Sequence, residues 1–182
     1  AVGAQLTDKG VARLLEIVAA VREAVGWEIP LAIDHLGPIT VKDAIRLGNA
    51  LEPYGLAWLE DIMPWRDVEA NRLVTRAINV PTLTGEDIYL LDGFRELIEE
   101  RAVDIIQPDL LTAGGMLETK RIADYAERFG IPTVLHCASS PIGYMANLHC
   151  AAAIPSFVAL ENHALDLPFW KGLVTRLPDP WL

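Results

Sequence analysis

The chain has 182 residues, a formal net charge of −10 and 52% hydrophobic residues. This length and apolar content suffice for one domain with a substantial core, and they exclude an intrinsically disordered chain. The acidic balance argues against nucleic acid or an anionic membrane surface as a partner, but it permits a small anionic substrate beside a bound cation. No long apolar run is present, so we expect no membrane span.

Short apolar runs alternate with helical stretches, and a helix is expected first, at Thr7–Val25. Each run ends in an acidic residue or a histidine, and these terminal residues follow one another at intervals of about 25 residues. The runs are Ile29–Asp34, Leu56–Glu60, Pro81–Glu86, Val103–Asp109, Ile131–His136 and Phe157–Glu161. The intervening stretches have apolar residues at helical spacing: Val41–Leu51, Val68–Ile78, Gly93–Glu100, Met116–Phe129 and Pro141–Ala153. This alternation predicts βαβ units and a parallel sheet.

Two α/β architectures fit a parallel sheet of this kind. A doubly wound open sheet would usually show a glycine-rich phosphate turn after its first strand, and the sequence has none. A TIM-type (β/α)₈ barrel has eight units and about 250 residues, of which this chain supplies about six. We therefore interpret residues 1–182 as one partial (β/α)-barrel domain, and we expect the first two strands to precede Ala1.

The ends of the predicted strands carry the candidate metal ligands. In a barrel the carboxyl ends of the strands meet on one face, where Asp34, Glu60 and Glu86 would crowd together. Carboxylates that close cannot all stay ionised without a cation, and hard oxygen ligands suit Mg²⁺, with Mn²⁺ as the alternative. The competing interpretation is that each acid only caps the helix that follows it.

Asp109 and His136 end neighbouring predicted strands, about 4.8 Å apart in a parallel sheet. An aspartate that holds an imidazole fixes its tautomer and raises its basicity, which suits acid–base catalysis near neutral pH. Taken alone, His136 would more often be a core histidine bonded to a backbone carbonyl. The aspartate in register favours the functional interpretation.

The ordered set of strand-end motifs resembles the enolase superfamily, and within it the mandelate racemase-like group. The similarity covers about residues 20 to 170, and its motifs are Ala32-Ile33-Asp34, Trp58-Leu59-Glu60-Asp61, Thr84-Gly85-Glu86-Asp87, Gln107-Pro108-Asp109 with Gly114-Gly115, Val134-Leu135-His136 and Ala159-Leu160-Glu161-Asn162. The resemblance implies that the three acids bind one Mg²⁺ and that Asp109 and His136 form the acid–base pair. It also implies that Glu161 hydrogen-bonds an oxygen of the substrate carboxylate.

Three features depart from the pattern of that group. A second base, often in a Lys-x-Lys pattern on the second barrel strand, has no counterpart, because none of Lys9, Lys42, Lys120 and Lys171 fits it. The small cap domain that sets substrate choice is not part of this chain. Where the group often has asparagine two residues after the first metal ligand, this sequence has Leu36.

Other polar and aromatic residues near the strand ends allow two interpretations. His35 and Trp65 are candidate substrate-binding residues, with a loop role for His35 and loop packing for Trp65 as alternatives. For His163 and Trp170, after the last strand, we favour a place outside the substrate pocket. Cys137 should point away from the His136 side of its strand, so it is not interpreted as a nucleophile. His149 and Cys150 are predicted to pack in or beside the core.

The function that the resemblance implies is removal of a proton next to a substrate carboxylate. Our leading hypothesis is dehydration of an aldonic or aldaric acid to a 2-keto-3-deoxy acid. The rivals are a racemase or epimerase with the same site, a non-catalytic truncated barrel, and another metal-dependent barrel enzyme such as an aldolase. The resemblance suggests a homo-oligomer, and two cysteines without a disulfide framework favour the cytoplasm. The sequence does not specify the sugar acid or the stereochemistry.

Overall fold

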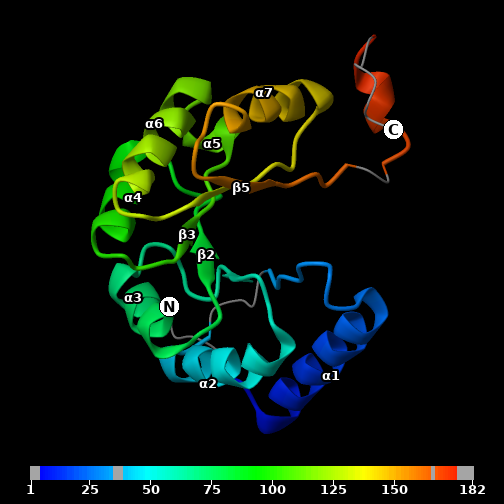
Figure 1. The fold of residues 1–182 in the computed structure, drawn as a ribbon, viewed down its shortest axis with the longest axis vertical. Helices are drawn as coiled ribbons and strands as arrows, with labels where there is room; N and C mark the ends of the chain where they lie inside the picture. Colours follow the sequence, from blue (N-terminus) through cyan, green and yellow to red (C-terminus); the bar gives the residue numbers. More distant parts are fainter. Residues whose placement is uncertain (1–4, 35–38, 165–166, 176–182) are drawn as a thin grey trace. The chain divides into compact units, whose positions relative to one another are not determined.

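The computed structural model describes residues 5–34, 39–164 and 167–175 (Figure 1). It comprises two compact units. The first is Ala1–Thr84 with Glu96–Ile105, and the second is Gly85–Arg95 with Ile106–Leu182. Helices and strands alternate along the chain, as the sequence predicts.

The helices of the first unit begin at side-chain caps. They are α1 (Asp8–Val25), α2 (Val41–Leu51) and α3 (Val68–Ala77). A short 3₁₀ turn, η1 (Glu52–Tyr54), follows α2 directly. Oxygens of Thr7, Thr40 and Asp67 accept main-chain N–H groups of the first turns, which otherwise lack intrahelical partners. The bounds of α2 match the prediction, and those of α1 and α3 differ from it by one residue.

The strands of the first unit are β1 (Leu59–Glu60) and β2 (Thr82–Thr84), which pair in parallel. Ile33 adds a parallel bridge to Leu59, and the N–H of Glu60 donates to the carbonyl of Ile33 at 2.8 Å. Asp34 and Glu60 therefore leave neighbouring strands at the same, carboxyl end.

A buried arginine ties the end of α1 to the chain before β1. Arg22 is 5% exposed, and its guanidinium lies 5.0 Å from the Trp27 ring centre. The guanidinium donates to four main-chain carbonyls at 2.8 to 3.0 Å, those of Gly26, Ile29, Tyr54 and Gly55. These bonds hold two loops, at Gly26–Ile29 and at Tyr54–Gly55, against the buried guanidinium.

The second unit contains the remaining strands and helices. Its elements are α5 (Leu110–Ala113), α6 (Met116–Glu127), β4 (Thr133–Leu135), α7 (Pro141–Ala151), β5 (Phe157–Leu160) and the 3₁₀ turn η2 (Trp170–Leu173). Residues of α4 (Leu90–Glu99) and β3 (Ile105–Ile106) are divided between the two units. The sequence analysis did not predict α5, η1 or η2.

The strands of the second unit are also parallel. Ile106 of β3 lies opposite Thr133 of β4, and β4 pairs with β5. Beyond the strands, Asp109 and His136 form an isolated parallel bridge. The carboxyl ends of these strands therefore bring the predicted acid–base residues side by side.

Each unit has its own apolar core. In the first unit it includes the fully buried Leu47, Leu51, Leu59 and Val74. A cluster in the second unit contains Leu110, Ala123, Leu135, Cys150, Ala151 and Ile154. The core position of Cys150 is confirmed, but the prediction for His149 was wrong, because its side chain is exposed on the outer face of α7.

Candidate active site

The predicted acid–base pair is formed in the second unit. Oδ2 of Asp109 lies 2.7 Å from Nδ1 of His136. Oδ1 of the same carboxylate caps α5 by accepting the N–H groups of Leu111, at 2.6 Å, and Thr112, at 3.0 Å. Oδ1 of Asp109 therefore caps the helix, and Oδ2 orients the imidazole of His136. With Nδ1 donating to Asp109, Nε2 is the nitrogen free to take up a proton.

Two further carboxylates lie near that nitrogen. Nε2 of His136 is 3.2 Å from Oε2 of Glu86 and 3.7 Å from Oε2 of Glu161. Burial alone would lower the pKa of His136, but the hydrogen bond that its Nδ1 donates to Asp109 and the charges of Glu161, Glu86 and Asp109 outweigh it and raise the pKa to about 9. Burial would likewise raise the pKa of Asp109, and its bonds with His136, Thr112 and Leu111 lower it instead. The imidazole is therefore a strong proton acceptor.

Hydrogen bonds hold both oxygens of Glu161. Oε1 accepts from Nε2 of Gln107 at 3.1 Å, and Oε2 accepts from the main-chain N–H of Cys137 at 3.2 Å. Gln107 is fully buried, and its own Oε1 has no hydrogen-bond partner among the described residues. Glu161 is thereby held beside His136 as an acceptor.

Glu86, which lies near His136, directly follows a glycine whose backbone packs closely against the chain at Gln107. Gly85 has φ +150°, and a Cβ at this position would lie 2.9 Å from the main-chain N, C and O atoms of Gln107. Only glycine permits this approach without displacing the backbone. Gly85 is thus the residue that lets Glu86 follow β2 at this position.

The two other predicted metal ligands lie in the first unit. Glu60 is 2% exposed, and the indole N–H of Trp58 donates to its Oε2 at 3.2 Å. Asp34 is exposed and leaves the neighbouring strand at the same end. A buried carboxylate needs a compensating charge, and an all-carboxylate donor set fits Mg²⁺ by its chemistry. The convergence of Asp34, Glu60 and Glu86 on one ion stays a prediction.

The two candidate substrate-binding residues have different outcomes. His35 lies outside the described residues. Trp65 is partly buried, its Nε1 is a buried donor without a hydrogen-bond partner among the described residues, and the guanidinium of Arg66 lies 4.2 Å from its ring centre. A substrate contact of Trp65 stays a prediction.

Sequence reasoning missed three participants in this site. Gln107, the N–H of Cys137 and His163 all lie next to Glu161, and Nε2 of His163 is 3.5 Å from its Oε2. The sequence did contain a signal for Gln107 and His163, because each lies two residues from a predicted site residue. In an extended chain, side chains two residues apart point to the same side. Burial raises the pKa of the Cys137 thiol, which agrees with its exclusion as a nucleophile.

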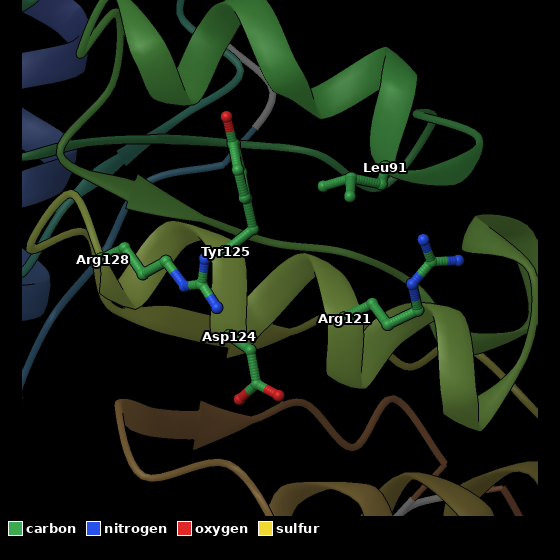
Figure 2. A pocket seen from close by; sticks show the side chains of 5 residues that line it. All are labelled: Leu91, Arg121, Asp124, Tyr125 and Arg128. Carbon is green, nitrogen blue, oxygen red and sulfur yellow. The ribbon is translucent and has the colours of Figure 1, made fainter.

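A separate surface hollow of about 240 Å³ contains none of these residues. Figure 2 shows it between Leu91 of α4 and the side chains of Arg121, Asp124, Tyr125 and Arg128 on or directly after α6. Asp124 is paired with Lys120, and Arg121 with Glu118. The residues of this hollow therefore form ion pairs along a helix face, and none of them is a histidine.

Parallel strands with interspersed helices, whose carboxyl ends present acids and a histidine–aspartate pair, define the chain as part of a barrel-type α/β domain. A family model described as "Enolase C-terminal domain-like" matches residues 2–180, and the chain belongs to this family. The fold class and the superfamily predicted from the strand-end motifs are confirmed.

Two similar curated proteins are named as dehydratases of sugar acids. A D-xylonate dehydratase of Haloferax volcanii is 46% identical over 160 residues, which are 88% of this chain and 39% of that protein. A D-mannonate dehydratase of Sphingomonas sp. is 35% identical over 89% of this chain and 40% of its own length. The chain thus spans about two fifths of the curated relatives that it matches.

A solved structure supports the same fold. The mandelate racemase/muconate lactonizing enzyme-like protein of Rubrobacter xylanophilus superimposes with a TM-score of 0.93 at 42% identity, over 97% of this chain and 44% of that one. Among the helices that the structure describes, none combines the length and the apolar character needed to cross a bilayer.

Proposed function

We propose that the full-length protein containing this chain is a Mg²⁺-dependent dehydratase that converts a sugar acid to a 2-keto-3-deoxy acid. The observation that carries the proposal is the imidazole of His136, held by Asp109 at 2.7 Å with Nε2 directed toward Glu86 and Glu161. The names of the curated relatives support the substrate class.

His136 takes the proton from the carbon next to the substrate carboxylate. Such a proton is very weakly acidic, so the base must be well placed and the developing charge must be neutralised. Asp109 keeps Nδ1 protonated and directs Nε2 at the substrate, and it stabilises the imidazolium once the proton has arrived. Loss of the neighbouring hydroxyl as water gives an enol, which tautomerises to the keto acid.

Asp34, Glu60 and Glu86 would hold the Mg²⁺ ion. Bound there, the ion would neutralise negative charge that builds up on the substrate carboxylate. The contact of Glu161 with a carboxylate oxygen of the substrate is part of the proposal. The small carboxylate substrate, the homo-oligomer and the cytoplasmic location predicted from the sequence stay proposals for the whole protein.

A panel of aldonic and aldaric acids tests this function. The full-length protein with Mg²⁺ should form a 2-keto-3-deoxy acid from at least one of them, detected as its semicarbazone. His136→Asn should abolish formation of this product, while His149→Asn, an exposed histidine on α7, should not affect it. Glu60→Gln should weaken Mn²⁺ binding measured by electron paramagnetic resonance. Exchange of the C2 proton with inversion but without loss of water would instead identify an epimerase.

A further inference from the structure

His163 lies at the edge of the site in a turn that follows β5. Its side chain is 52% exposed and comes two residues after Glu161. Oδ1 of Asn162 accepts the N–H of Ala164 at 3.1 Å, and Ala164 is buried. The turn is therefore anchored on both sides of His163, although the imidazole itself reaches solvent.

Two imidazole nitrogens flank one carboxylate oxygen. Nε2 of His136 is 3.7 Å and Nε2 of His163 is 3.5 Å from Oε2 of Glu161, and these three atoms all lie within 4.8 Å of one another. The two rings meet nearly at right angles, with centres 5.6 Å apart. At this separation both nitrogens can reach groups on adjacent carbons of one substrate molecule, from the same side.

Dehydration needs a second proton transfer, to the hydroxyl that departs. Hydroxide is a poor leaving group, so the departing hydroxyl needs a proton as the carbon–oxygen bond breaks. Glu161 is arranged as an acceptor, because Gln107 and the N–H of Cys137 already donate to its two oxygens. Nε2 of His163 lies 3.5 Å from Oε2 of Glu161, which is long for a hydrogen bond.

We propose that His163 is the proton donor to the hydroxyl that leaves as water, which makes it a second catalytic residue of the proposed dehydration. His136 removes the proton from C2, and the C2–H electron pair forms the C2–C3 double bond. The C3–O bond breaks, and its oxygen takes the proton from Nε2 of His163 and leaves as water. The neutral imidazole of His163, being half exposed, regains a proton from solvent, the imidazolium of His136 releases the proton that it took from C2, and the enol tautomerises to the keto acid. This inference rests on the proposed function, and the proton transfer from His163 needs no additional cofactor.

The test separates the two proton transfers in the full-length protein. In His163→Asn, dehydration should fall at least about 100-fold, the usual contribution of a positioned acid, while exchange of the C2 proton in D₂O continues. A substrate with fluorine in place of the C3 hydroxyl needs no proton on its leaving group. Its release of fluoride should therefore stay within about threefold of the wild-type rate, a result that a merely structural role would not give.

Three outcomes are decisive. Dehydration by His163→Asn within about threefold of wild type overturns the role of His163, as does an equal loss with the hydroxy and fluoro substrates. If the wild type neither dehydrates any acid nor exchanges a C2 proton, the proposed function itself fails. His149→Asn is the matched control, and His163→Gln is the second variant if the thermal midpoint of His163→Asn differs from that of the wild type.

Discussion

Replacing Asp109 by asparagine should change the protonation of His136 while leaving the fold intact. The asparagine oxygen can still accept the N–H groups of Leu111 and Thr112, since asparagine is a good helix cap. What is lost is the negative charge 2.7 Å from Nδ1 of His136. That bond is the largest contribution that raises the pKa of His136, which burial alone would lower. We expect the pKa to fall from about 9 by at least about one unit.

The same shift has a consequence for stability. The pKa of His136 rises from the usual 6.5 in the unfolded chain to about 9 in the folded one. Its contribution is therefore fully present below pH 6.5 and is lost as the pH rises through 9. A shift of this size corresponds to about 3 kcal/mol, as an order of magnitude. In Asp109→Asn the loss of stability between pH 6.5 and pH 9 should be smaller, because the pKa of His136 is raised less in the folded variant.

Two assays measure these effects without metal, in EDTA. The imidazole resonances of ¹⁵N-labelled protein give the pKa of His136 directly, and urea unfolding between pH 6 and pH 10 gives the stability. Titrations elsewhere in the chain contribute equally to wild type and variant, so the difference between the two curves reports the pair. An unchanged pKa of His136 in Asp109→Asn would refute the proposed coupling.

Three further variants test individual contacts. Arg22→Ala should lower the free energy of unfolding by about 3 kcal/mol, because four main-chain carbonyls lose the donor that holds them. The exposed Arg13→Ala should change it by less than about 0.5 kcal/mol in the same urea titration. Gly85→Ala should destabilise by about 2 kcal/mol through its clash with the Gln107 backbone, and Gly172→Ala, which meets no atom within 4 Å, should not. Gln107→Leu should lower kcat about tenfold with little change in KM for substrate, and an unchanged kcat would show that its bond to Glu161 is dispensable.

Much of the fold could be predicted because its signals are local. The apolar periodicity predicted the bounds of α2 and α3 within a residue. The helix α5 was missed because its four residues are too few to show a period, and it is stabilised by the cap at Asp109 and ends at Gly114 with φ +118°. Short elements of this kind depend on tertiary contacts that a linear pattern does not contain.

The site could be predicted where the last residue of each strand was enough to identify a functional side chain. Asp109 and His136 could be paired because each ends a strand and neighbouring parallel strands are adjacent. Gln107 was not assigned and His163 was placed outside the substrate pocket, since an amide or a loop histidine gives no chemical signal until its neighbours in space are known. The burial of Gln107 and the 3.5 Å approach of His163 to Glu161 are properties of the folded chain only.

The rate at which hydrogen leaves C2 of the substrate tests the central claim most directly. In D₂O with Mg²⁺, ¹H NMR of the sugar acid that the full-length protein dehydrates should show loss of the C2 signal together with product. His136→Asn should lower that rate by at least about 1,000-fold, whereas His149→Asn should leave it unchanged. A C2 exchange rate that survives His136→Asn would contradict the account, because some other group would then be removing the proton.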